Sequence, residues 1–254
     1  MKKLILFLLA FLPVLSHGQQ TLACLEPYQP MYFLVGDNPA AKFQVSFKFK
    51  LLTDDGWLAT NAAWFKGLTF AYTQRSLWAI TEYSSPFYDT SYMPELFYET
   101  PWVPIGRGFR ITGHAGYGHE SNGKDGPASK SINKLTATVS IARDFGKWTA
   151  TVTPTVWYYI ADMSDNPDMQ SYRGYGDLTV SVGRSDGLKV SVYGRAGYNL
   201  KRGAVQIDAT YPIDFLTRSI AVYFTVQYWN GYGESMLDYN KTQQSLRAGI
   251  SFVR

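Results

Sequence analysis

The sequence predicts an all-β protein, a twelve-stranded antiparallel transmembrane β-barrel. The chain has 254 residues, 16% of them aromatic and 46% hydrophobic, yet its mean hydropathy is only −0.17. Many short stretches alternate apolar and polar side chains with a period of two, as strands do when one face meets lipid or a core and the other meets water. Short turns and long polar loops also alternate between these stretches, which is typical of outer-membrane barrels. Composition alone leaves an aromatic-rich soluble β protein as the alternative.

Residues 1–18 are expected to be a secretory signal peptide. Lys2 and Lys3 precede the apolar run LILFLLAFLPVL, and Ser16 and Gly18 supply the small residues of a cleavage site after Gly18. A transmembrane helix is the alternative reading, but the apolar run is too short to span a bilayer.

The mature chain is expected to consist of a short periplasmic N-terminal arm, residues 19–29, and one barrel domain, residues 30–254. No internal repeat or linker divides the barrel domain. Cys24 is the only cysteine, which excludes an internal disulfide. A lipoprotein cut before Cys24 fits poorly, because that residue lies well beyond the apolar run. The 24 basic and 20 acidic residues are too evenly balanced to indicate a nucleic-acid partner.

Twelve alternating stretches are expected to form the barrel strands. The clearest is residues 43–51, where phenylalanine, valine and leucine alternate with glutamine, serine and lysine. Two-sided polarity of this kind requires an apolar medium on one side and water on the other. The twelve stretches are residues 31–35, 43–51, 66–78, 92–101, 109–121, 132–143, 148–160, 174–183, 188–199, 203–212, 219–229 and 245–253.

The lengths of the connections between these stretches give evidence for a barrel that is independent of the strand pattern. The turns at 144–147 and 184–187 are short, whereas several other connections are long and polar. Pairs of strands separate the long connections, so they all fall at one end, which in outer-membrane barrels is the external end. The long loops are residues 79–91, 122–131, 161–173 and 230–244.

One hairpin, residues 109–133, gathers polar residues on an otherwise apolar face. His119 and Ser121 end the apolar face of the outgoing strand, and Asn133 begins the apolar face of the returning strand. If the two strands pair, Asn133 lies beside His119 and Ser121. A nucleophile, a base and a group that orients the base are the minimum set for acyl transfer. For an isolated His-x-Ser pair, a solvated loop end is the alternative interpretation.

The apolar face of a barrel points to lipid, so this trio is expected on the outer wall near the external leaflet. A membrane lipid is the obvious substrate there, because polar groups that face lipid are costly unless they have a function. Gln74 is expected on the same wall, since it shares a face with Phe70, Tyr72 and Trp78. An amide in hydrocarbon seeks a partner. A register shifted by one residue would instead place Gln74 in the lumen.

Several motifs resemble the outer membrane phospholipase A family of Gram-negative bacteria, and their combination is specific and spans most of the mature chain. The resemblance implies a twelve-stranded outer-membrane barrel that is inactive as a monomer and active as a calcium-bound homodimer. It also implies phospholipase A1 and A2 activity, the hydrolysis of acyl esters in phospholipids and lysophospholipids. The motifs are YTQRSLW at 72–78, SSPFYDTSYMPELF at 84–97, HESNG at 119–123, PASKSIN at 127–133, SDNPD at 164–168 and GYGESMLDYN at 231–240.

The resemblance assigns Ser121 as the nucleophile, His119 as the general base and Asn133 as the group that fixes the imidazole tautomer. A neutral third member avoids placing a carboxylate against hydrocarbon, although it stabilises the imidazolium less. The backbone N–H of Gly123, together with calcium-polarised water, is implied to hold the oxyanion.

The resemblance also implies a calcium site and a dimer contact. Calcium prefers hard oxygen ligands, here the carbonyl of Lys124, the hydroxyl of Ser129 and Ser84 of the partner subunit. The segment from Trp78 to Ser84 is shorter than in the family, which leaves Ser85 as an alternative to Ser84. Gln74 is implied to pair across the dimer interface.

Two other functions fit the same sequence. A porin or structural barrel would keep the strand pattern without chemistry, and a lipid acyltransferase would share the acyl-enzyme step and differ only in the acceptor. Labelling of Ser121 by a sulfonyl fluoride separates an inert barrel from an enzyme, and product analysis separates the two enzymes.

Overall fold

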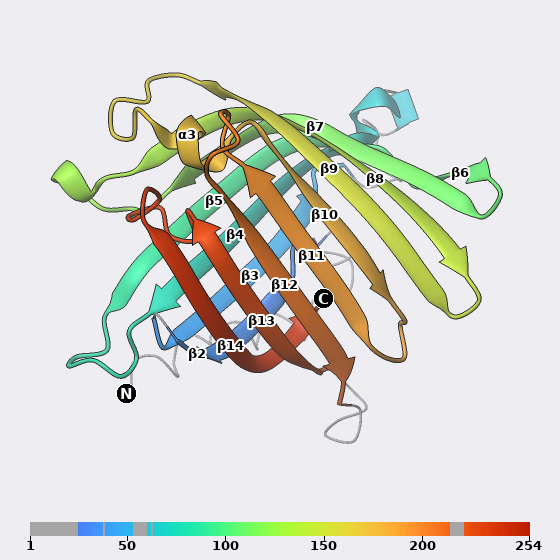
Figure 1. Cartoon of the computed structure of the whole chain (residues 1–254). Helices are drawn as coiled ribbons and strands as arrows, with labels where there is room; N and C mark the ends of the chain where they lie inside the picture. The colour runs from blue at the N-terminus through green and yellow to red at the C-terminus, as the bar shows by residue number, and fades with distance from the viewer. Residues whose placement is uncertain (1–24, 38, 53–59, 62, 214–220) are drawn as a thin grey trace, which may run out of the picture.

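The computed structural model describes residues 25–37, 39–52, 60–61, 63–213 and 221–254. The expected signal peptide, residues 1–18, and Cys24 lie outside the described residues. The described chain is a closed antiparallel β-barrel (Figure 1).

Twelve strands in the described residues make the barrel wall, which confirms the predicted fold. Each pairs with the next along the chain, and β14 pairs with β2 to close the cylinder. The strands are β2 (Met31–Gly36), β3 (Ala41–Lys50), β4 (Leu68–Trp78), β5 (Phe87–Glu99), β7 (Phe109–Ser121), β8 (Ser131–Phe145), β9 (Trp148–Ile160), β10 (Gly176–Gly183), β11 (Lys189–Ala196), β12 (Gly203–Pro212), β13 (Tyr223–Tyr232) and β14 (Thr242–Val253).

Two short strands extend the wall. β1 (Leu25–Pro27) pairs with β3 in line with β2, and β6 (Val103–Gly106) pairs with β7 in line with β5. Residues 25–27 belong to the segment expected to be an N-terminal arm, so the described end of that segment lies against the wall as a strand.

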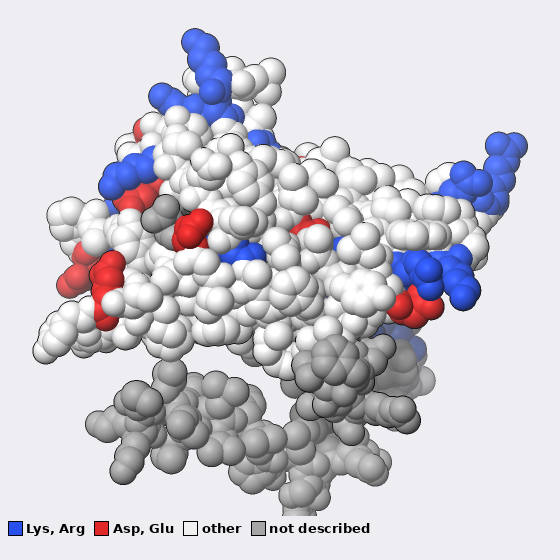
Figure 2. Space-filling view, turned by 60° about the horizontal axis from the view of Figure 1, so that its bottom comes forward, with Lys and Arg blue, Asp and Glu red and all other residues white. Residues whose placement is uncertain are grey.

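The wall is apolar outside and polar inside, the reverse of a water-soluble protein. Along β9, Val152, Val156 and Tyr158 are 41%, 59% and 67% exposed, while the intervening threonines face the lumen. Most of the wall in Figure 2 is uncharged, and charged side chains stand mainly near its margins. This alternation is the one expected of a barrel whose outer face contacts hydrocarbon. No helix in the described residues is long and apolar enough to cross a membrane.

β5 begins at Phe87, five residues earlier than the alternation predicts. The difference has a physical cause, because polar residues at the start of this strand face the lumen and make it resemble a loop. The buried Asp89 carboxylate accepts hydrogen bonds from the Ser235 hydroxyl at 2.8 Å and the Leu237 N–H at 2.9 Å. The loop between β4 and β5 is correspondingly shorter than expected.

The long-loop end of the lumen is covered by a small apolar cluster. The short helix α3 (Met169–Arg173), visible above the barrel mouth in Figure 1, and the 233–241 loop carry most of its members. Burial and the neighbouring Asp168 carboxylate, which accepts a hydrogen bond from the Tyr239 hydroxyl, raise the pKa of Tyr239. The cluster comprises Ile132, Met169, Tyr172, Met236 and Tyr239.

Below this cover, the lumen contains a buried ion network. Glu234 accepts from Lys42 Nζ at 3.0 Å and from Arg247 Nη1 at 2.6 Å. Lys42 also donates to Gln227 Oε1 at 2.6 Å. Lys42 lies in β3, Gln227 in β13 and Arg247 in β14, whereas Glu234 lies in the 233–241 loop. Their contacts therefore fix the position of that loop relative to the barrel wall.

We expect Glu234→Ala to destabilise the barrel by about 3–5 kcal/mol, because removing one member of a buried ion network leaves the others uncompensated. Lys42 and Arg247 would lose the carboxylate that they share. Urea unfolding in detergent micelles measures the change. Asp186→Ala is the control, since Asp186 pairs with Arg184 in an exposed turn, and its midpoint should stay at that of the wild type. Equal midpoints for the two variants would contradict the prediction.

Candidate active site

The β7–β8 hairpin brings the predicted trio together. In its antiparallel register His119 lies opposite Asn133, and Ser121 lies opposite Ser131 at the end of the hairpin that leads into the 122–130 loop. The alternation of the two strands predicted that Asn133 would lie beside His119 if the strands paired, and in the observed register the two residues lie opposite each other.

The trio lies on the outer wall. Glu120, between His119 and Ser121, is only 1% exposed and forms an ion pair with Arg173 at 3.0 Å inside the lumen. Tyr117 and Leu135, which have the same phase as the trio, are 41% and 51% exposed. Because successive side chains of a strand point to opposite faces, His119, Ser121 and Asn133 project outward.

His119 and Asn133 are hydrogen-bonded. Nδ1 of His119 lies 2.9 Å from Oδ1 of Asn133. An amide oxygen can only accept, so Nδ1 carries the proton and Nε2 is left with the lone pair that a general base needs. The Ser121 hydroxyl makes no hydrogen bond to any described residue. Such a nucleophile–base contact often closes only when substrate is bound.

Tyr117 adds a contact that the sequence did not predict. Its hydroxyl donates to the same Oδ1 of Asn133 that receives Nδ1–H of His119. A carbonyl oxygen has two lone pairs, and both are then occupied, which holds the amide in the orientation that keeps oxygen toward the imidazole. The sequence signal was available, because Tyr117 precedes His119 by two residues on the same face.

Asn122 organises the loop after Ser121 and was not predicted from the sequence. It is buried, its Nδ2 donates to Ala128 O at 2.9 Å, and its Oδ1 accepts from the N–H of Lys130 at 3.0 Å and of Lys124 at 3.3 Å. Asparagine commonly forms such side-chain to backbone bonds in turns, so the SNG sequence carried the signal. One side chain therefore holds both ends of the 122–130 loop.

Gly123 meets two demands that only glycine satisfies. Its φ is +64°, and a Cβ would lie 2.8 Å from the Tyr92 ring. Its N–H donates to no described residue, so it remains available beside Ser121 as an oxyanion donor of the kind that stabilises acyl-transfer transition states.

The expected calcium ligands lie in two loops at the same end of the barrel. Lys124 and Ser129 belong to the 122–130 loop, and Ser129 Oγ donates to Asp165 Oδ2 at 3.1 Å. Ser85 Oγ donates to Ile80 O at 3.0 Å within its own loop, whereas the Ser84 hydroxyl has no partner in the described structure. Carbonyl and hydroxyl oxygens suit a hard cation. No three His, Cys, Asp or Glu side chains of the described residues form a metal-binding group.

Gln74 faces outward in the same row as Ser121. It pairs with Tyr92, which in turn pairs with Ser121, and its Oε1 accepts from the Tyr72 hydroxyl at 3.1 Å. The next residue, Arg75, lies in the lumen 3.7 Å from Glu120. The alternative register, with Gln74 in the lumen, is therefore wrong.

Comparison with known proteins gives the family of this chain. The family model described as Phospholipase A1 matches residues 10–252. The chain belongs to the phospholipase A1 family. Phospholipase A1 of Escherichia coli K12 is 35% identical over 213 residues, which are 82% of this chain and 68% of that protein. A Neisseria meningitidis serogroup B relative is 38% identical over 221 residues, which are 83% of this chain and 54% of that protein.

Solved structures of the phospholipase A1 family have the same fold. The outer membrane phospholipase A of E. coli aligns with a TM-score of 0.77 at 28% identity over 94% of this chain and 95% of that chain. A variant of that enzyme with an active-site asparagine replaced by alanine aligns at 0.76 and 28% identity, over the same shares of both chains. A calcium-bound dimer of the Salmonella typhi outer membrane phospholipase aligns at 0.75 and 26% identity over 94% and 96%. The chain is thus an outer-membrane β-barrel of a family of ester hydrolases.

We expect Tyr117→Phe to lower kcat about 3- to 10-fold with little change in KM, the effect of losing one hydrogen bond worth ~1 kcal/mol. Without the phenolic donor, the Asn133 amide can rotate and offer its NH2 group to the imidazole. The kinetics of acyl-ester hydrolysis in mixed micelles, measured across pH, test this. Tyr158→Phe, another exposed outer-wall tyrosine, is the matched control, and an equal loss there would contradict the positioning role.

Proposed function

We propose that this chain hydrolyses acyl esters of glycerophospholipids and lysophospholipids at the external leaflet of the outer membrane, in a calcium-dependent homodimer. The observation that carries the proposal is the His119–Asn133 hydrogen bond beside Ser121 on the outer wall. A site in that position can receive a lipid acyl chain directly from the bilayer.

Each side chain of the site has a role in the proposed reaction. His119 Nε2 takes the proton of the Ser121 hydroxyl as its oxygen attacks the ester carbonyl, and later returns it to the departing glycerol oxygen. Asn133 holds the imidazole through Nδ1, and the Gly123 N–H donates to the developing oxyanion. The active-site asparagine of the E. coli relative supports an amide in this position.

Calcium fits the oxygens that the 122–130 loop offers. The carbonyl of Lys124 and the hydroxyl of Ser129 would hold it, together with Ser84 of the partner subunit. The bound cation would polarise water toward the oxyanion. The calcium-bound dimer of the S. typhi relative supports this arrangement. The choice of Ser84 is supported by its hydroxyl, which has no partner in the described residues, whereas Ser85 Oγ donates to Ile80 O. Gln74, on the outer wall in the row of Ser121, would then lie at the interface.

Ser121→Ala should reduce phospholipid hydrolysis by at least about a thousandfold, the scale seen when a hydrolase loses its nucleophile. Acyl release from mixed micelles measures the loss, and a sulfonyl fluoride should label the wild type but not the variant. Ser131→Ala, the neighbour across the hairpin, should keep the label. Activity that survives in Ser121→Ala would end the proposed mechanism. A wild type that folds but neither labels nor hydrolyses would favour the inert barrel, and acyl transfer to a second lipid would favour an acyltransferase.

Calcium chelation should abolish activity and shift the protein from dimer to monomer in sedimentation experiments, because the proposed site is shared between subunits. Ser84→Ala should do the same at moderate calcium, while Ser85→Ala should not. Mixing Ser84→Ala with Ser121→Ala provides the decisive comparison. One site of the mixed dimer combines an intact Ser121 with the partner subunit's Ser84, so activity should return. No recovery in a dimer proven to be mixed would contradict a shared site.

A further inference from the structure

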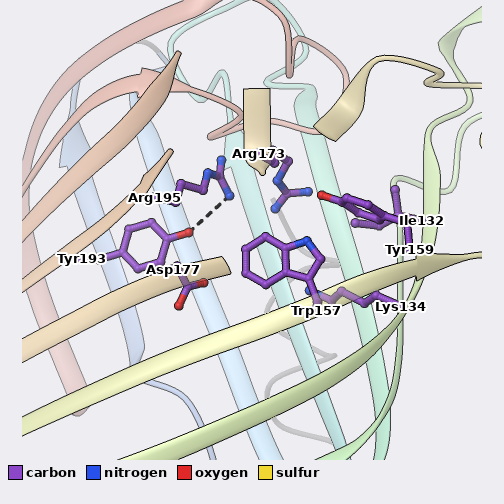
Figure 3. Close-up of a pocket in the computed structure, with 8 residues that line it drawn as sticks. All are labelled: Ile132, Lys134, Trp157, Tyr159, Arg173, Asp177, Tyr193 and Arg195. Atoms are coloured by element: carbon purple, nitrogen blue, oxygen red, sulfur yellow. Dashed lines mark hydrogen bonds between the residues drawn. The ribbon is translucent and has the colours of Figure 1, made fainter. Parts of the chain in front are cut away.

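A cavity of about 60 Å³ lies inside the barrel, below α3 and behind the β7–β8 hairpin. Side chains from β8, β9, β10, β11 and α3 line it (Figure 3). A buried water needs roughly 10–15 Å³ of such space, so the cavity has room for a small ion together with a few waters. It opens on the opposite face of the wall from the catalytic trio.

Hydrogen-bond donors without partners are concentrated at this cavity. Five buried side-chain polar atoms in the described residues lack a hydrogen-bond partner. Three of them belong to cavity-lining residues, namely Trp157 Nε1, the Tyr159 hydroxyl and Arg195 Nε. Indole and guanidinium N–H groups can only donate, and a phenol can donate. Trp157 Nε1 and Arg195 Nε can therefore be satisfied only by an acceptor, and an acceptor can also receive the Tyr159 hydroxyl.

Positive charge is also in excess around the cavity. Arg173 uses its guanidinium for Glu120, at 3.0 and 3.3 Å. Lys134 Nζ lies 5.4 Å from the centre of the Trp157 ring. Arg195 lies over the Trp229 ring and donates to the Tyr193 hydroxyl and to the carbonyls of Tyr232 and Gly233, and Asp177 lies opposite it in the β10–β11 register. Within the described chain neither Lys134 nor Arg195 has a carboxylate within 4.0 Å. Asp177 is the one acidic group in the lining, and Figure 3 shows its carboxylate turned away from Arg173.

Neighbouring charges do not remove this excess. Arg75 lies 3.7 Å from Glu120, and Glu95 flanks Gly118 together with Lys134. The lining residues and these immediate neighbours comprise four cations (Arg75, Lys134, Arg173, Arg195) and three carboxylates (Glu95, Glu120, Asp177). An uncompensated buried charge is strongly unfavourable. Water can satisfy donors but cannot neutralise charge.

We propose that the cavity is a binding site for one small monovalent inorganic anion, with chloride as its simplest occupant. The donors on Trp157, Tyr159 and Arg195 would contact the anion, and Lys134 and Arg173 would supply the surrounding positive potential. The site is independent of the hydrolytic reaction, because it needs neither Ser121 nor a bound cation at the loops.

Bromide soaking of crystals of the full-length barrel tests occupancy directly. Bromide scatters anomalously, and an anomalous peak is expected between Trp157, Tyr159 and Arg195. The double variant Trp157→Phe/Tyr159→Phe retains every charge but removes two donors, and its peak should be lost or greatly weakened. Density that shows waters and no bromide in the wild type would overturn the proposal, as would a peak of unchanged height in the double variant.

Chloride dependence of stability tests binding in solution. Urea unfolding is measured at constant ionic strength as gluconate is replaced by chloride. Above the dissociation constant, a tenfold rise in chloride should raise the folded-to-unfolded ratio about tenfold, the slope for one site that exists only in the folded state. The double variant should lose this slope, and Tyr158→Phe, on the outer face of the same strand, should keep it.

A flat chloride response in the wild type would overturn the proposal, and so would equal slopes in all three proteins. Sulfate in place of chloride tests the charge preference of the site. Because sulfate stabilises folded proteins in general, the assignment to a monovalent anion would be overturned if sulfate stabilised the wild type more than chloride does and the double variant lost that extra stabilisation. If the double variant does not fold, Arg195→Met paired with Arg184→Met, at an exposed turn, makes the same comparison. The Arg195 variant should then lose the chloride slope and the Arg184 variant should keep it.

Discussion

The two-residue period of the barrel strands is the constraint on which the rest of the structure depends. A strand in a closed barrel has only two environments, hydrocarbon outside and the polar lumen inside, so the phase of each strand assigns every side chain to one of them. In β7 and β8 that phase places Ser121, His119 and Asn133 outside. A slip of one residue would move all three into the lumen, and would put Glu120 against lipid.

The phase is secured mainly from within the lumen. Glu120 bonds to Arg173 of α3, and Ile132 packs into the apolar cluster that closes the long-loop end. These two residues are the immediate sequence neighbours of Ser121 and Asn133. The inner contacts therefore hold the strands in the register that brings His119 opposite Asn133, while the outer face keeps its small polar site. The positioning contacts and the proposed chemistry lie on opposite sides of one hairpin.

The sequence predicted the barrel because alternation is a local property that survives without knowledge of tertiary contacts. The prediction of strand bounds failed where buried polar residues of the lumen interrupt the alternation. Asp89 is one such residue, and it made the start of β5 resemble a loop. The placement of His119 beside Asn133 followed from pairing two adjacent strands. Contacts such as that between Lys42 and Glu234, 192 residues apart, depend on closure of the whole cylinder and could not be predicted from the sequence.

Tyr117 and Asn122 show where the limit lies within the site. Both are close in sequence to residues that were predicted, and both act through hydrogen bonds that depend on side-chain rotamers and on the path of a nine-residue loop. The role of Tyr117 follows from the position of the site on a wall that faces lipid. Hydrocarbon offers no water to orient an amide, so that function falls to a protein donor. Tyr117 orients Asn133, Asn122 holds the loop that presents Gly123, and no carboxylate has to face the bilayer.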